Sequence, residues 1–283
     1  MSAYPTAPAS GPSAAPSRPT VPATVRPRHT GTRAALSDAA TLIGRSVRLT
    51  RRDVEMVVLA LVLPLMMMLL FVYVFGGAIE TGGAYLDYVV PGIVLLCAGF
   101  GAASTAPAVA HDMTGGMIDR LRSMPIRPSA LLVGHVTASV ARNAVATAVV
   151  VVVALLMGFR PAAGPLGWLA AAAVVLGYVL ALSWLAAALG TVARSVQGAN
   201  GATFVMLFLP YLSSAFVPVQ TMPAFLVPFA RYQPVTPVIE TVRALLAGLP
   251  AGPALWSALA WEAGLLLASF ALAAALFRRR TRG

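Results

Sequence analysis

The chain has 283 residues, of which 59% are hydrophobic and 10% are charged, and its formal net charge is +11. Soluble domains are about 45–50% apolar and about 25% charged, so this composition excludes an ordinary soluble fold and favours segments that span a bilayer. The basic residues are all arginine, and most lie beside hydrophobic runs. Their positive charge therefore indicates membrane topology and lipid head groups, not nucleic-acid binding.

Lysine is absent from the chain, and its absence excludes a nucleotide-binding P-loop. In that motif a lysine neutralises the β- and γ-phosphates, so a chain without lysine cannot form it. Any ATP-driven work must then be powered by ATP and Mg²⁺ bound to another polypeptide. We expect this chain to be no enzyme and to bind no cofactor.

Residues that hold metals or form disulfides are scarce. The single cysteine, Cys97, lies inside an apolar run, where we expect a small buried hydrophobe and no internal disulfide. The three histidines show no metal-ligand spacing. Membrane enzymes that act on lipid head groups need clustered carboxylates or histidines. The sequence contains no such cluster.

The first 54 residues divide into two parts. Residues 1–35 are rich in Pro, Ala, Ser and Thr and lack the apolar core of a cleavable signal peptide, so we expect a disordered cytoplasmic arm. Across 36–54, apolar residues recur on one face at helical spacing, which predicts an amphipathic helix in the membrane interface. A solvated basic linker is the alternative. The opposite face carries Arg45, Arg48 and Arg52.

Six apolar runs predict an all-α membrane protein with six transmembrane helices over 55–278, followed by a basic cytoplasmic tail at 279–283. The third run exceeds a hydrocarbon core of about 30 Å, so its first turns are expected at the cytoplasmic interface, with Arg142 near head-group depth. The predicted spans are about 55–76, 88–110, 130–158, 166–191, 199–217 and 254–277.

The distribution of arginine sets the orientation, because cytoplasmic loops carry the excess of basic residues. With both termini inside, 16 arginines lie on the cytoplasmic side and 3 lie outside, while Arg142 falls within the third span. The three outer arginines are Arg160, Arg231 and Arg243. The predicted location is a bacterial plasma (inner) membrane, crossed several times.

One acidic residue, Glu262, is expected within a span. Ion-coupled transporters carry ionisable residues at mid-membrane depth, so this carboxylate leaves an ion-coupled secondary transporter open as an alternative function. A polar contact between helices is the other interpretation.

Two further segments differ from ordinary loops. Residues 111–128 combine helix-breaking glycines, a short apolar face and several charges, which is typical of a surface helix that docks into a soluble partner. A simple interfacial turn is the alternative. Residues 218–248 are mildly apolar but interrupted by five prolines, so two short helices, about 222–230 and 236–247, are predicted as a re-entrant hairpin in the outer leaflet. An ordinary surface loop is the alternative there.

With these segments the chain resembles the permease subunits of ABC exporters of the second integral-membrane class, a family that includes daunorubicin-type drug-efflux permeases. The resemblance covers about 37–280 and rests on the amphipathic helix, the six spans, MIDRLRSMPIRPSALLVGH and FVPVQTMPAFLVPFARYQPVTPVIETVRALL. It implies export of a hydrophobic drug-like or lipid-like cargo, as in antibiotic resistance. It also implies a homodimer, or a heterodimer with a related permease, above two cytoplasmic ATP-binding cassette subunits.

The resemblance also implies roles for individual residues. Residues 112–127 would match the helix that couples the permease to its ATPase, which the amphipathic helix would also touch. The residues expected at this contact are Met117, Asp119, Arg120, Leu121, Arg122, Arg45, Arg48 and Arg52.

The same resemblance places the cargo route. Glu240 and Arg243 would lie in the second helix of the outer hairpin, which would cap the outer end of the pathway. The first, second and fifth spans would line the route. The methionines of the first span could contact an apolar cargo, and the alternative is that they only face lipid. The candidate cargo contacts are Met66, Met67, Met68, Phe204 and Phe208.

Overall fold

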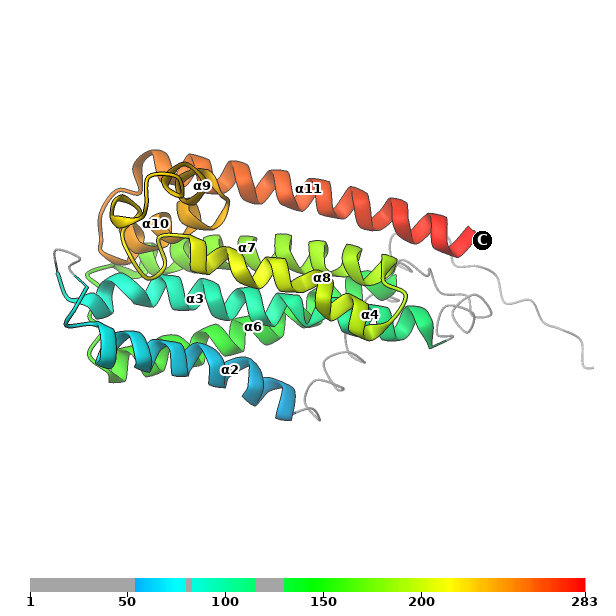
Figure 1. Cartoon of the computed structure of the whole chain (residues 1–283), viewed down its shortest axis with the longest axis horizontal. Helices are drawn as coiled ribbons and strands as arrows, with labels where there is room; N and C mark the ends of the chain where they lie inside the picture. Colours follow the sequence, from blue (N-terminus) through cyan, green and yellow to red (C-terminus); the bar gives the residue numbers. More distant parts are fainter. Residues whose placement is uncertain (1–53, 80–82, 116–129, 283) are drawn as a thin grey trace, which may run out of the picture.

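The computed structural model of the chain describes residues 54–79, 83–115 and 130–282 (Figure 1). Within these ranges the regular secondary structure is helical and no strand occurs. The predicted all-α class is therefore confirmed for this part of the chain. Among the described residues, four helices are long and apolar enough to cross a membrane: Tyr85–Thr114, Ala130–Leu156, Pro165–Val192 and Gly252–Arg280. The arm predicted at 1–35 and the interfacial helix predicted at 36–54 lie outside the described residues, except for Val54.

The first two predicted spans form helices, which differ from the prediction in detail. α2 (Val54–Leu69) continues into a π-helical turn at Leu70–Phe75. The second span begins earlier than predicted, because α3 (Tyr85–Ala103) includes the tyrosine-rich turn before Pro91. α4 (Thr105–Thr114) then extends the same apolar helix.

The third span, α6 (Ala130–Leu156), has 27 residues and is about 40 Å long, which exceeds a hydrocarbon core. Arg142 lies near its middle, and its Nη2 donates a hydrogen bond to Ser104 Oγ at 3.1 Å. Ser104 lies between α3 and α4 and donates to the carbonyl of Gly101. Arg142 thus has a polar partner within the helix bundle, and the head-group depth expected for it stays a prediction.

The fifth predicted span is shorter than expected. α7 (Pro165–Val192) leads into α8 (Val196–Phe208), and a single 3₁₀ turn, η2 (Leu209–Leu212), follows. The prediction of helix to residue 217 is wrong, because Pro210 has no N–H to continue the hydrogen-bond ladder and Ser213 adopts an extended conformation.

Two short helices precede the last span, as predicted, although the first begins later. After the turn η3 (Val219–Thr221), the helices are α9 (Val227–Tyr232) and α10 (Val235–Leu246). Pro228 lies in the first turn of α9, where a missing N–H interrupts no intrahelical bond. The re-entrant position of this pair in a bilayer stays a prediction. The chain ends with the long helix α11 (Gly252–Arg282).

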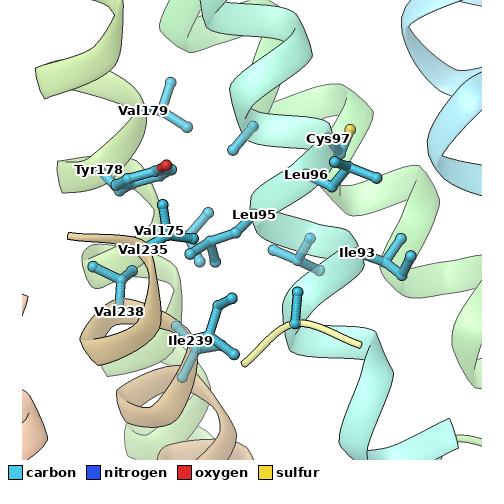
Figure 2. Packing of buried hydrophobic residues seen from close by; sticks show 14 of the residues in the cluster. Ile93, Leu95, Leu96, Cys97, Val175, Tyr178, Val179, Val235, Val238 and Ile239 are labelled. Carbon is cyan, nitrogen blue, oxygen red and sulfur yellow. The ribbon is translucent and has the colours of Figure 1, made fainter. Parts of the chain in front are cut away.

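The core of the bundle forms around α3, which contacts α2, α6, α7, α8 and α10. Most of its side chains are buried. Gly92 allows an especially close approach, because a Cβ at that position would lie 2.6 Å from the carbonyl oxygen of Ala215. Figure 2 shows part of one buried cluster that joins α3 to α7 and α10 through Leu95, Leu96, Tyr178, Val179, Val238 and Ile239.

α11 packs along α7, its principal neighbour in the bundle. Near the end of α7, the Arg280 guanidinium donates to the carbonyls of Thr191 and Ala193. The last carbonyls of a helix have no intrahelical donor, so Arg280 satisfies part of the C-terminal end of α7.

Candidate functional site

The connector, defined as residues 209–217, is irregular backbone packed inside the helical bundle. Ser213, Ser214, Ala215 and Phe216 are all buried. In an apolar environment each unsatisfied backbone polar group costs several kcal/mol, so a connector at this position requires donors from neighbouring side chains.

Side chains from α3 and from the turn between α9 and α10 supply several of these donors. The Gln233 amide donates through Nε2 to the carbonyls of Leu209 and Leu212, at 3.2 and 3.1 Å. The Tyr85 hydroxyl, at the start of α3, donates to the carbonyl of Phe216 at 2.8 Å. These bonds hold the connector between α3 and the α9–α10 pair.

Arg243 of α10 makes three hydrogen bonds and a cation–π contact in this region. Its Nε and Nη2 donate to the carbonyl of Tyr88 at 3.2 and 3.1 Å, and Nη2 also donates to the carbonyl of Ser214 at 2.8 Å. The guanidinium carbon lies 3.8 Å from the centroid of the Tyr88 ring, within the range of a cation–π interaction. One side chain therefore joins α10, α3 and the connector.

The charge of Arg243 is retained despite its position. Partial burial lowers the pKa of the Arg243 guanidinium, while the neighbouring Tyr88 and Glu240 act in the opposite direction. An arginine stays protonated in proteins, so its hydrogen bonds are charge-assisted. Glu240, on the same helix, is exposed, and the two residues that the sequence placed together therefore differ in environment.

An aromatic row runs from α8 through the connector to the π-helical turn that follows α2. Successive ring centroids are separated by 5.2, 6.2, 5.6, 4.2 and 5.5 Å. Phe204 and Phe208 are 59% and 51% exposed. The exposed members of the row, at its two ends and at Tyr211, present aromatic surface that apolar ligands or a second protein chain can contact, whereas Phe216 in its middle is buried. In order its members are Phe204, Phe208, Tyr211, Phe216, Phe71 and Phe75.

The three predicted methionine contacts lie on different sides of α2. Met66 is 51% exposed, whereas Met68 is fully buried in the core. Met67 is half-buried and packs against that same core. Of these side chains, Met66 is the one most available to a ligand.

The predicted ATPase contacts lie outside the described residues: Met117, Asp119, Arg120, Leu121, Arg122, Arg45, Arg48 and Arg52. The helices on either side of 116–129 are nevertheless joined. His135 Nε2 of α6 and Asp112 Oδ2 of α4 lie 2.9 Å apart, in a hydrogen bond between largely buried side chains. This pair connects the two helices from which that segment departs and to which it returns.

Glu262 of α11 is 8% exposed, and its Oε1 has no hydrogen-bond partner among the described residues. Its carboxylate packs against α7, where a Cβ at Gly177 would lie 2.6 Å from Glu262 Oε2. The described residues contain no group of three or more His, Cys, Asp or Glu that could hold a metal ion.

These features define a multi-pass helical membrane protein with a polar-bonded connector and a pair of short helices before its last long helix. The family model described as "ABC-2 type transporter" matches residues 38–247. The chain therefore belongs to the ABC-2 type transporter family, and it is a membrane permease subunit. The family implies an ATP-binding cassette protein as its partner.

Two relatives share most of this chain. The daunorubicin resistance ABC transporter permease protein DrrB1 of Streptomyces coeruleorubidus is 31% identical over 217 residues, which cover 76% of this chain and 74% of the relative. The probable doxorubicin resistance ABC transporter permease protein DrrC of Mycobacterium tuberculosis is 29% identical over 234 residues, covering 80% of this chain and 84% of the relative.

The bonds that hold the connector were not found from the sequence. The resemblance places Arg243 in the outer hairpin without a partner, Tyr85 is expected only in an aromatic belt at the outer boundary, and no role is expected for Gln233. A usable signal was present, because polar side chains in an apolar, proline-interrupted segment need partners, and the irregular backbone nearby needs donors.

We predict that Arg243→Lys destabilises the permease, because an ammonium is a single point donor and cannot reproduce the planar fork that reaches two carbonyls and stacks on Tyr88. The loss of a charge-assisted hydrogen bond should lower the free energy of unfolding by about 2 kcal/mol. Thermal unfolding of the purified protein in detergent measures this effect, and Arg231→Lys, on the exposed surface of α9, is the matched control.

A second pair of variants tests the same connector through backbone packing instead of side-chain hydrogen bonds. Gly92→Ala places a methyl group against the Ala215 backbone, whereas the Cβ of Gly99→Ala meets nothing within 4 Å. Gly92→Ala should lower the melting temperature as Arg243→Lys does, and Gly99→Ala should not. Equal melting temperatures for all these variants would show that the connector does not depend on this packing.

Proposed function

We propose that this chain is the membrane-spanning permease subunit of an ATP-driven ABC exporter that moves a hydrophobic drug-like cargo out of the cell. Family membership carries the proposal, and the names of the two relatives favour anthracycline-like compounds as the cargo class. A lipid-like cargo of similar apolar character is the variant of the same proposal. The cargo would contact the aromatic row and Met66, because planar apolar molecules stack on aromatic faces.

The energy would come from a separate cytoplasmic subunit. A chain without lysine has no P-loop, so ATP and Mg²⁺ would bind to the partner. The contact residues would be Asp119, Arg120 and Arg122, with Met117 and Leu121 as their apolar neighbours. Arg45, Arg48 and Arg52 would add a second contact from the interfacial helix.

We propose six membrane crossings with both termini in the cytoplasm of a bacterium, in its inner membrane. The additional crossings are α2 with its π-helical turn and α8 with the connector, and the paired helices α9 and α10 would lie in the outer leaflet. The arginine distribution supports this orientation. A reporter enzyme fused after Gly248 should be active outside, and one fused after Arg122 should be active inside; the reverse pattern would reject the orientation.

The permease would act as a homodimer, or as a heterodimer with a related permease. The aromatic row links α8, with exposed Phe204 and Phe208, through the connector to the π-helical turn after α2, where Phe75 is exposed. Two copies that meet across this face would enclose an apolar pathway between them. Cross-linking through cysteines at Phe204 and Met66 would report that arrangement.

Transport itself is tested in inside-out vesicles that contain the permease and its cognate ATPase. Daunorubicin should accumulate in the vesicles only with ATP, and replacing the P-loop lysine of the ATPase should reduce uptake to the level of empty vesicles. The alternative, an ion-coupled secondary transporter, rests on the buried carboxylate of Glu262. Uptake that needs no ATPase and is abolished by Glu262→Gln would establish the alternative instead.

We predict that combined substitution of Asp119, Arg120 and Arg122 by alanine uncouples the two subunits. These charges are expected to form the docking surface, so their loss should bring cargo-stimulated ATP hydrolysis close to the basal rate while membrane insertion is retained. The matched control is alanine at Arg278 and Arg279, which are basic residues near the end of α11. Undiminished stimulation in the triple variant would exclude this segment as the coupling contact.

A further inference from the structure

A lateral groove lies between α6 and α7, away from the aromatic row. Its volume is about 360 Å³, and its floor is formed by α3 and α10 through the buried residues Val94 and Val242. The rim includes exposed Ala148 and Val152 of α6 and exposed Leu176 of α7. Both rims belong to helices apolar enough to span a membrane, so in the proposed topology the groove would open into the hydrocarbon region of the bilayer.

Small side chains create the groove. Ala144 and Ala148 of α6 face the groove beside Ala171 and Ala172 of α7, so the space between the two helices is left unfilled near α10. Most of the remaining lining is aliphatic, and the groove is therefore suited to a hydrocarbon chain and not to a polar molecule. Trp168, in the first turn of α7, lines the groove as well, and a tryptophan near a helix end is typical of the head-group level.

A second pocket, which contains charged residues, adjoins the groove at the end of α10. It has a volume of about 500 Å³, and Leu246 of α10 lines both spaces. Among the described residues that line this second pocket, called the head pocket below, the charged ones are Arg160, Arg243 and Asp87, so two guanidinium groups face one carboxylate in this lining. An apolar groove and a positive pocket thus share one wall.

The two arginines retain donors for a ligand. Arg160 is exposed, and its two hydrogen bonds, to the carbonyls of Leu155 and Phe159, both use Nη1. The hydrogen bonds of Arg243 to Tyr88 and Ser214 use Nε and Nη2. Since a guanidinium has five N–H donors on three nitrogens, each arginine has further donors available for a phosphate.

We propose that the groove and the head pocket together bind one anionic phospholipid of the bilayer, with an acyl chain in the groove and its phosphate at Arg160 and Arg243. The positive charge of the head pocket favours an anionic head group, and the position of the groove mouth favours a molecule already dissolved in the membrane. With the proposed topology, the lipid comes from the outer leaflet. The site shares no residue with the aromatic row, so it is distinct from the proposed cargo surface.

The bound lipid would stabilise the α9–α10 pair. Val242 and Leu246 of α10 line the groove, and Arg243 lies between them in the sequence and lines the head pocket. A phospholipid at this site would therefore contact the helix that also holds the connector in place. The lipid would act as a structural ligand of the permease, independent of ATP and of cargo.

Native mass spectrometry of the full-length chain in detergent tests the proposal. After delipidation, the protein is titrated with phosphatidylglycerol or with phosphatidylcholine that has the same acyl chains. The expected result is one tightly bound phosphatidylglycerol per chain and weaker binding of phosphatidylcholine. Arg160→Gln should weaken phosphatidylglycerol binding about fivefold, the effect of one basic side chain near an anionic lipid, and should leave phosphatidylcholine binding unchanged.

Filling the groove separates this site from lipid that coats the whole protein. Ala148→Trp should weaken binding of both lipids about tenfold by displacing roughly two methylenes from the groove, and Ala172→Trp fills it from the opposite rim. The matched control is Val145→Trp, which adds the same side chain at a 61% exposed position of α6 outside the groove.

Three outcomes would overturn the proposal. The groove is not the site if Ala148→Trp and Ala172→Trp bind lipid as Val145→Trp does. The head pocket is not the site if phosphatidylglycerol and phosphatidylcholine bind equally and Arg160→Gln affects neither. Displacement of bound phosphatidylglycerol by daunorubicin at micromolar concentration would show that the groove belongs to the cargo pathway. All measurements are made without ATP or the ATPase, so failure of the proposed transport function would not affect them.

Discussion

The organisation of this permease depends on the need to satisfy backbone polar groups inside an apolar bundle. A continuous helix satisfies its own backbone, but the connector at 209–217 departs from the helical pattern where Pro210 interrupts it. The missing bonds are supplied from outside, by Tyr85 of α3, by Gln233 between α9 and α10, and by Arg243 of α10. The hydrogen bonds that satisfy the carbonyls of the connector consequently also hold the two short helices against α3.

This arrangement determines where the aromatic row lies. Phe216 is placed by the hydrogen bond from Tyr85 to its carbonyl, and its ring stacks 4.2 Å from that of Phe71. Tyr211, on the 3₁₀ turn, continues the row toward α8. A rearrangement of α10 would therefore move the connector and the aromatic face together. In the proposed exporter, this link would let a change at the outer helices alter the surface that contacts cargo.

Hydropathy predicted the helical class, the long apolar helices and the pair of short helices before α11, because these features follow from local composition and proline positions. It did not predict that α8 ends before Pro210, since apolar residues continue to Val217 and a hydropathy pattern does not register a missing N–H. The close contact of Gly92 with Ala215 and the hydrogen bonds of Arg243 to Tyr88 join residues more than 100 positions apart. Such pairs cannot be read from spacing along one helix. The coupling residues stay predictions, because they lie outside the described part of the chain.

The use of arginine also changes how the net charge of +11 is understood. Several arginines of the described region donate to backbone carbonyls instead of facing carboxylates: Arg160 at the end of α6, Arg280 at the end of α7, and Arg243 at α3 and the connector. A guanidinium can make such bonds and still keep its charge and further donors. Arginine therefore contributes to the fold and to the surface potential at once. The ammonium group of lysine has three donors on one nitrogen, and hydrogen bonds to backbone carbonyls would use most of them. Arg160 and Arg243 line the same pocket, and each bonds to backbone carbonyls while keeping its charge and further donors. For this reason we propose an anionic head group as the ligand of the pocket.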